Sequence, residues 1–188
     1  MEIKYKIEFF SNWHCGSGLA SGADLDELVI KDAEGLPFVP GKTMKGLLRE
    51  AFGNVCSYHK KNDKSCMKKI FGYDNDNTED EGKTSEESKG YAFFSNADLE
   101  KDEKDAIISR DLIPFLYQSV TSTKIDNEGI AANLTLRKIQ TTVPCILYGH
   151  IYDVPEDYKE LFIDAFHFIK RIGLGRNRGY GRCQISIE

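Results

Sequence analysis

The chain has 188 residues, of which 40% are hydrophobic, and a formal net charge of −5. This composition fits one globular domain, and no apolar run approaches the roughly 20 residues that a membrane-spanning helix needs. Residues 1–6 lack the features of a signal peptide, so we expect a cytoplasmic protein whose five cysteines are reduced thiols.

The negative charge is concentrated in one segment. Residues 74–89 contain seven acidic residues and two lysines, which account for the whole net charge. Lysine and arginine gather in residues 42–69 and 170–182, and the second of these regions contains no acid. Both regions suit a polyanionic partner, although the whole chain is acidic. The acidic segment is too polar to pack, so we expect it to be disordered.

The N-terminal part predicts a strand, a hairpin and a helix. Apolar and polar residues alternate over residues 3–9, which is the pattern of a half-buried strand. The small residues of 16–23 predict a loop, and residues 28–40 predict a hairpin. Thr43 is the expected N-cap of a helix whose apolar face runs from residue 44 to residue 52.

The remaining elements complete a simple order. Strands are predicted at 91–95, 141–154 and 182–187, a helix at 158–171, an exposed loop or hairpin arm at 114–136, and a glycine-rich loop at 173–181. If residues from about 55 to 89 and from 114 to 136 are insertions, the order becomes βαββαβ. We therefore predict one α+β domain over residues 1–188, with a ferredoxin-like, four-stranded antiparallel sheet as in RNA-recognition motifs.

The glycine-rich loop is the strongest candidate binding element. Its sequence, GLGRNRGYGR at residues 173–182, combines glycines that permit close backbone approach with arginines that match phosphate geometry. An aromatic ring in the loop is suited to stacking on a base. The candidate RNA contacts are Gly173, Gly175, Arg176, Arg178, Gly179, Tyr180 and Arg182. The alternative is a helix C-cap and a tight turn with solvated arginines.

A second basic group lies at the start of the helix predicted after residue 41. Lys42, Thr43, Lys45 and Arg49 lie close to its N-terminus, where backbone amides and the helix dipole favour phosphate. A solvated basic face is the alternative interpretation.

The segment after this helix has the side chains of a possible zinc site. Cys56 and His59 have an acceptable ligand spacing, and Cys66 is close enough to be a third ligand. A fourth ligand is missing locally, and His14 or Cys15 would have to come from elsewhere in the fold. The alternative is a basic surface loop with incidental thiols.

Four motifs in order resemble the RAMP superfamily of CRISPR-associated proteins. They are FVPGKTMKGLLRE at residues 38–50, YAFFSNADL at 91–99, LTLRKIQTTVP at 134–144 and the loop GLGRNRGYGR. Asn96 stands where the family usually has Asp. The resemblance covers nearly the whole chain. Within the superfamily, the motifs are most similar to those of the backbone subunits of type III effector complexes.

This resemblance implies a specific function. Such subunits stack as copies along a guide RNA (crRNA) beside other effector subunits, insert a hairpin thumb into the guide–target duplex, and cleave target RNA with one Asp and a divalent metal, Mg or Mn. Asp26 matches the position of that Asp best and Asp24 is second. Lys124 and Arg137 flank the presumed thumb as weaker RNA contacts, and some relatives hold zinc in the insertion. From the residues alone, the favoured interpretation of both Asp side chains is that of ordinary loop carboxylates that cap a turn.

Other functions are compatible with these residues. The chain also fits a non-catalytic structural or capping RAMP subunit, for which replacing Asp26 has no effect. A stand-alone guide-processing ribonuclease usually has two such domains and often a histidine base. A general RNA-binding module would bind single-stranded RNA without regular spacing.

Overall fold

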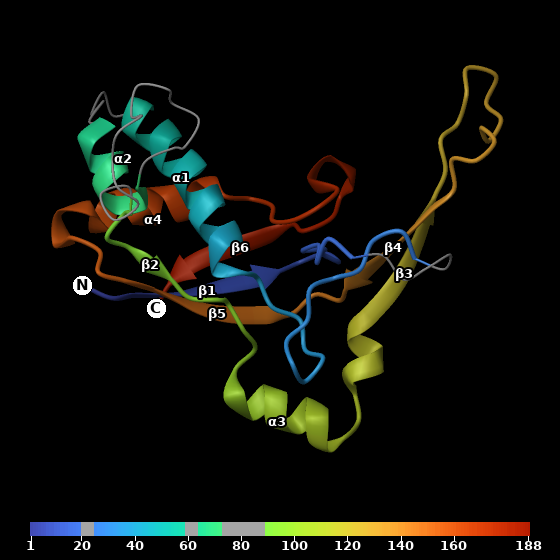
Figure 1. The fold of residues 1–188 in the computed structure, drawn as a ribbon, viewed down its shortest axis with the longest axis horizontal. Coiled ribbons are helices and arrows are strands. Elements are labelled where there is room, and N and C mark those ends of the chain that lie inside the picture. Colours follow the sequence, from blue (N-terminus) through green and yellow to red (C-terminus); the bar gives the residue numbers. More distant parts are fainter. Residues whose placement is uncertain (20–24, 59–63, 73–88) are drawn as a thin grey trace.

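The structure is a computed structural model that describes residues 1–19, 25–58, 64–72 and 89–188, without the side chains of residues 64–66. Asp24, His59 and nearly all of the acidic segment 74–89 lie outside the described residues. Helices cover one side of a sheet, and a long hairpin projects away from this body (Figure 1).

One antiparallel sheet forms the centre of the fold. Its strands are β1 (Ile3–Phe9), β2 (Phe93–Phe94), β5 (Ile146–Tyr152) and β6 (Cys183–Ile187), in the order β2-β5-β1-β6. The central strand β1 pairs Tyr5 with Gly149 of β5 and Ile7 with Ile185 of β6. With one helix after β1 and another after β5, the order is βαββαβ. This confirms the predicted ferredoxin-like fold.

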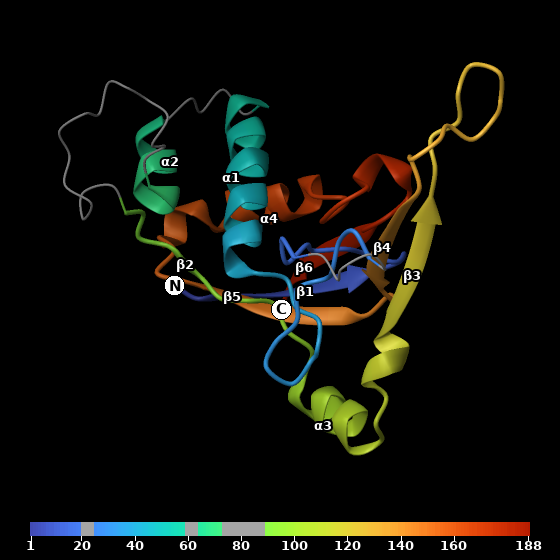
Figure 2. The same cartoon turned by 45° about the vertical axis from the view of Figure 1, so that its right-hand side comes forward.

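Three helices lie on the same side of this sheet. They are α1 (Gly41–Tyr58), α2 (Lys64–Phe71) and α4 (Lys159–Phe168), and Figure 2 shows them above the strands. The core between them is aromatic: the ring centroids of Phe52 and Phe162 lie 5.3 Å apart, and those of Tyr5 and Phe166 lie 5.2 Å apart. Alternate residues of β1 are buried, as the period of two predicted.

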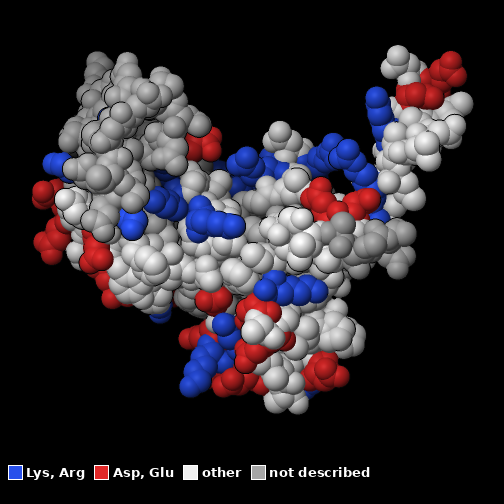
Figure 3. All heavy atoms as spheres, in the orientation of Figure 1, with Lys and Arg blue, Asp and Glu red and all other residues white. Residues whose placement is uncertain are grey.

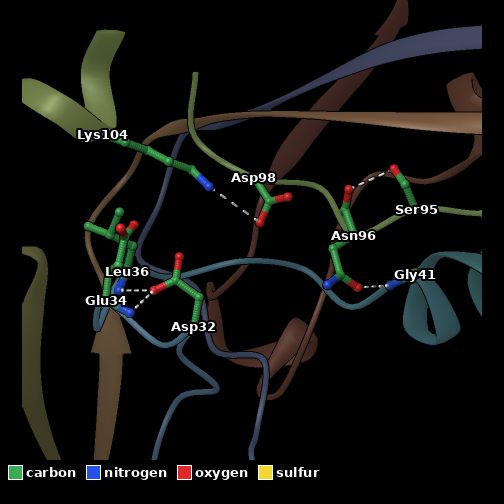
Figure 4. A network of polar contacts seen from close by, with 8 residues as sticks. All are labelled: Asp32, Glu34, Leu36, Gly41, Ser95, Asn96, Asp98 and Lys104. Carbon is green, nitrogen blue, oxygen red and sulfur yellow. Dashed lines mark hydrogen bonds and ion pairs between the residues drawn. The ribbon is translucent and has the colours of Figure 1, made fainter. Parts of the chain in front are cut away.

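The start of α1 differs from the prediction. The helix begins at Gly41, and the backbone N–H groups of Thr43 and Met44 both donate to the Pro40 carbonyl. The Gly41 N–H donates to Oδ1 of Asn96 at 3.0 Å (Figure 4). Thr43 is therefore not the N-cap, because an amide side chain from the segment after β2 satisfies the first helical N–H.

The predicted hairpin at residues 28–40 closes around a tight turn. Lys31 pairs with Pro37, and Oδ1 of Asp32 accepts hydrogen bonds from the N–H groups of Glu34 and Leu36 (Figure 4). Such a side chain-to-backbone turn is the role that Asp commonly has in loops. In the same view, Nζ of Lys104 lies 3.9 Å from Oδ1 of Asp98 (Figure 4).

The hairpin arm forms its own two-stranded sheet, and we call residues 117–142 the thumb. It consists of β3 (Tyr117–Ser122), β4 (Arg137–Thr142) and the tip at residues 123–136. The predicted single strand at 141–154 is wrong. Thr142 pairs with Tyr117 in the thumb, whereas Ile146 pairs with Glu8 in the central sheet. The chain changes sheets near Pro144, which has no backbone N–H to continue a ladder.

Several smaller elements adjust the predicted boundaries. The helix α3 (Lys101–Ser109) was not predicted, and Ile107 is its one buried residue, so it has little apolar periodicity. The predicted helix 158–171 is confirmed as α4, which ends at Phe168. The described residues also form three short 3₁₀ helices: η2 (Ile113–Leu116), η3 (Glu156–Tyr158) and η4 (Arg176–Arg178).

Candidate nucleic-acid interface

A groove of about 910 Å³ lies between the thumb and the body of the molecule, and we call it the thumb groove. It is lined by residues of β3, β4 and α1, by the end of α4, and by the loop at residues 173–182, which we call the Gly-Arg loop. Its cationic side chains are Arg137, Lys170, Arg171, Arg176 and Arg178, and its acidic ones are Glu27 and Glu50. Figure 3 shows Lys and Arg side chains gathered between the helices and the thumb.

The Gly-Arg loop is anchored to the segment that follows β1. The Leu174 N–H donates to the His14 carbonyl and the Gly181 N–H donates to the Asn12 carbonyl, both at 2.8 Å. Nη1 of Arg171 donates to the Arg176 carbonyl at 2.7 Å. These contacts hold the backbone of the loop in place while leaving the loop guanidinium groups on the surface.

The predicted loop residues divide into two groups. Gly173, Gly175, Arg176, Arg178 and Tyr180 line the thumb groove, and both of these arginines are exposed. Tyr180 is half-buried, because its ring packs against the Cα of Gly175.

The other two predicted loop residues, Gly179 and Arg182, are not among the described residues that line the groove. Arg182 directly precedes β6, and its N–H donates to Oγ of Ser11. The predicted binding loop is therefore split, with its first half and Tyr180 turned toward the thumb.

The basic residues predicted at the start of α1 lie apart from this groove. Lys42 is exposed, and Lys45 and Arg49 are half-buried, but the described groove lining from α1 consists of other residues of the helix. Thr43 lines a separate pocket of about 310 Å³ beside His14. The first helical N–H is already bonded to Asn96, so the helix offers fewer free amides to phosphate than the sequence implied.

Asp26 lies beside the base of the thumb. Its N–H donates to the Lys138 carbonyl at 2.9 Å, and its Oδ2 accepts a hydrogen bond from the Lys138 N–H at 2.7 Å. The backbone carbonyl of the next residue, Glu27, accepts a hydrogen bond from the Gln140 N–H. The segment around Asp26 therefore runs along β4, with one carboxyl oxygen held and the side chain exposed.

The thumb tip carries an apolar surface that the sequence analysis did not identify. Ile125, Ile130, Leu134 and Leu136 are all exposed there. Lys124 lies in the same tip, where its N–H donates to Oγ1 of Thr135. Exposed apolar side chains on a projecting hairpin are typical of a binding surface.

The predicted zinc ligands are only partly described. Cys56 is buried in α1, His59 lies outside the described residues, and the side chain of Cys66 is not described. Among the described residues, no three His, Cys, Asp or Glu side chains come together. The zinc site stays a prediction.

Lys170 and Arg171 are groove residues that the sequence analysis did not select. Both follow α4 directly and are exposed. They belong to the acid-free basic run 170–182, so charge patterning was the signal that could have identified them.

Comparisons with known proteins agree with this architecture. The structure resembles a chain of a type III-B Cmr-beta complex bound to cognate target RNA, with a TM-score of 0.74 and 12% identity over 100% of this chain and 97% of that chain. It also resembles a chain of the apo complex, with a TM-score of 0.68, 12% identity and the same coverage. No curated protein matches the sequence. Among the described helices, none has the length and apolar character of a membrane span.

The sequence model of the RAMP superfamily matches residues 6–184. This match runs from β1 into β6 and includes the thumb and the whole Gly-Arg loop. The chain therefore belongs to the RAMP superfamily.

Proposed function

We propose that this chain is a guide-RNA-binding backbone subunit of a type III CRISPR effector complex. In this proposal, copies stack along the guide beside other effector subunits, and the thumb engages the duplex between guide and target RNA. The observation that carries it is the thumb groove, in which five cationic side chains line one surface between the Gly-Arg loop and the thumb. The similarity to type III-B complexes supports the same assignment.

The groove has the chemistry that an RNA backbone requires. Guanidinium groups bind phosphate oxygens in a bidentate manner, and release of counterions makes such binding depend on salt. Glu27 and Glu50 on the same surface disfavour a uniformly anionic occupant at their positions and favour ribose hydroxyl contacts there. Tyr180 offers an aromatic ring to a base at the same surface.

The test for guide binding compares two arginines in the groove with one outside it. Each bound phosphate contributes about −0.7 to the slope of log K against log salt for single strands, so five contacts predict a slope of about −3.5. Replacing Arg176 and Arg178 together by Ala should reduce this slope by about 1.4 units, without removing the Arg176 carbonyl that holds Arg171.

The matched control is Arg110→Ala, an exposed arginine that follows α3 at the opposite end of the molecule. This variant should bind as the parent does at every salt concentration. Equal slopes for the parent and the double Arg176/Arg178 variant would refute the assignment of the groove.

We further propose that Asp26 cleaves the target RNA. The 2′-oxygen of a displaced nucleotide attacks the adjacent phosphorus, the bond from phosphorus to the 5′-oxygen breaks, and the products are a 2′,3′-cyclic phosphate and a 5′-hydroxyl. Asp26 accepts the 2′-hydroxyl proton, and water supplies the proton to the leaving oxygen. A divalent ion, Mg²⁺ or Mn²⁺, neutralises phosphate charge when bound.

One observation favours the non-catalytic alternative. Oδ2 of Asp26 already accepts the Lys138 N–H, so the carboxylate has a structural role at the base of the thumb. Asp26→Asn separates the two roles, because the amide oxygen can still accept that hydrogen bond but the side chain cannot take a proton.

With guide and target RNA present, the parent should give evenly spaced products with cyclic phosphate ends, and Asp26→Asn should give none while its guide affinity stays unchanged. The control Asp102→Asn, on the exposed side of α3, should cleave normally. Unchanged cleavage by Asp26→Asn would assign the chain to the structural or capping class.

A further inference from the structure

The buried side chain of His14 is held in one protonation pattern. His14 follows β1, is 1% exposed, and has its Nδ1 atom 2.6 Å from the carbonyl oxygen of Gln140 in β4. A carbonyl oxygen only accepts hydrogen bonds, so Nδ1 must carry the proton. In the neutral ring, Nε2 is then a lone-pair acceptor.

The second ring nitrogen faces another acceptor. Nε2 has no hydrogen-bond partner among the described residues, and Oε2 of Glu27 lies 3.6 Å from it, which is longer than a hydrogen bond but within range of a charge contact. Both residues line a pocket of about 310 Å³, lined also by Gly16, Thr43 and Gly173. A positive charge between two acceptors that face each other satisfies both lone pairs.

That charge is either a proton or a metal ion. An imidazolium ion in this buried position would have one charged partner, a carboxylate whose side chain is 47% exposed, to offset its loss of hydration. A histidine that donates its first nitrogen to a backbone carbonyl and presents its second nitrogen is the usual arrangement of a metal ligand. Two ligand bonds of about 2.1 Å can span the observed 3.6 Å separation.

We propose that His14 Nε2 and Glu27 bind one divalent cation at the edge of the thumb groove. A mixed imidazole and carboxylate donor set favours a transition-metal ion such as Mn²⁺ over Mg²⁺ or Ca²⁺, which prefer oxygen ligands alone. Two protein ligands leave coordination positions for water or for phosphate oxygens. Glu27 also lines the thumb groove, so the inference deepens the proposed function by naming residues that hold a metal beside the RNA.

The experiment uses Mn²⁺ and the RNA-free full chain. Paramagnetic Mn²⁺ broadens the NMR signals of nearby nuclei, so substoichiometric Mn²⁺ should broaden the His14 imidazole signals first. His150 provides an internal control, because its Nδ1 lies 2.7 Å from Oε1 of Glu2 and this histidine–glutamate pair needs no ion between its atoms. The His150 signals should stay sharp at the same ratio of Mn²⁺ to protein. A tenfold excess of Mg²⁺ over Mn²⁺ should not restore the broadened His14 signals.

Two variants test each ligand. Glu27→Gln has the same shape without the charge and should raise the Mn²⁺ concentration that broadens His14 by at least about tenfold. His14→Asn keeps a donor for the Gln140 carbonyl and removes Nε2, so calorimetry should show one fewer high-affinity Mn²⁺ site. Circular dichroism and thermal unfolding confirm that both variants fold.

Three results would overturn the proposal: His14 signals that broaden no earlier than those of His150, Mn²⁺ binding that is unchanged in Glu27→Gln, or ¹⁵N shifts that show both His14 nitrogens protonated at neutral pH in the metal-free protein. These readouts need neither RNA nor cleavage. A failed metal site therefore leaves guide binding untouched, and an inactive Asp26 leaves the metal site untouched.

Discussion

Gly173 lies close against the backbone of the segment after β1. It has a φ of 92°, and an added Cβ would lie 2.1 Å from the His14 carbonyl oxygen. Gly179 in the same loop has a φ of 91°, but an added Cβ there meets nothing within 4 Å. Both positions therefore have a positive φ, and they differ in whether an added Cβ would meet another part of the backbone.

Alanine at these two positions should give different losses of stability. Gly179→Ala should cost about 1–2 kcal/mol of unfolding free energy, which is the penalty of a left-handed backbone for an L-residue. Gly173→Ala should cost at least about 3 kcal/mol, because the loop must also move off the His14 carbonyl. Urea unfolding measures both values, and equal costs would mean that the close approach is absent.

Three cysteine thiols should be unreactive in the folded protein. Burial raises the pKa of Cys15, Cys145 and Cys183 to about 12 in each case. At pH 8 their thiolate fraction is then about a thousandfold lower than for a thiol with the ordinary pKa of about 9. Iodoacetamide labelling followed by mass spectrometry should be at least that much slower in the native protein than in urea. Rapid native labelling of Cys15 or Cys183 would contradict the burial of the segment after β1 or of β6.

At the scale of single elements, α1 depends on a side chain that lies far away in the chain. The Gly41 N–H donates to Asn96, which follows β2. Asn96→Ala should destabilise the fold by about 1 kcal/mol, the usual cost of losing an N-cap acceptor. Asn96→Asp, which restores the residue usual in the family, keeps the acceptor and adds a favourable negative charge at the helix N-terminus.

In thermal unfolding, the Tm of Asn96→Asp should therefore equal or exceed that of the parent, and the Tm of Asn96→Ala should be lower. An alanine variant as stable as the parent would mean that water replaces the Asn96 cap without cost. The control is Ser109→Ala at the end of α3, where Oγ bonds only a neighbouring carbonyl on the surface, and this change should be neutral.

At the scale of the whole molecule, the thumb projects away from the compact body (Figure 1). Its apolar tip is exposed, and Leu134 there is fully exposed with a φ of 59°. An apolar residue in a strained backbone conformation at a surface tip costs stability without a benefit to the isolated chain. The tip therefore suits contacts that form only in an assembly.

The proposed assembly predicts a dependence on RNA length. The chain alone carries a net charge of −5, so copies repel one another in the absence of a guide. With guides of increasing length, sedimentation should show whole-number increases in bound copies, and the protein alone should stay monomeric. The double Arg176/Arg178 variant should bind fewer copies per guide than the parent at every guide length. A single copy on all guides would contradict stacking.

Many elements could be predicted from sequence because their signals are local. The alternation in residues 3–9, the three-and-four spacing of α4 and the turn chemistry of Asp32 each depend on residues close in the chain. The density of glycine and arginine at 173–182 likewise identified the loop before its position was known. The helix α3 escaped prediction because it buries one residue and therefore lacks an apolar period.

The candidate site was predictable only in part. Charge patterning found the basic run 170–182, but pairing with the thumb base at Arg137 depends on how β3 and β4 fold back. The cap of α1 by Asn96 and the contact of His14 with Gln140 join residues 55 and 126 positions apart. Thr43 is the expected cap because it is the suitable side chain nearest in sequence. A rule that considers only neighbouring residues cannot find a capping side chain that comes from a distant segment.

The residue pattern of this protein thus specifies its fold class, its order of elements and the chemistry of its loop, because hydrophobic period, turn residues and charge act over short stretches. The folded chain specifies which of those residues meet. The groove between the Gly-Arg loop and the thumb, and the pair His14 and Glu27, exist because the segment after β1 and residues 26–27 both run beside β4. Long-range contacts of this kind follow from packing the core, and no local pattern encodes them.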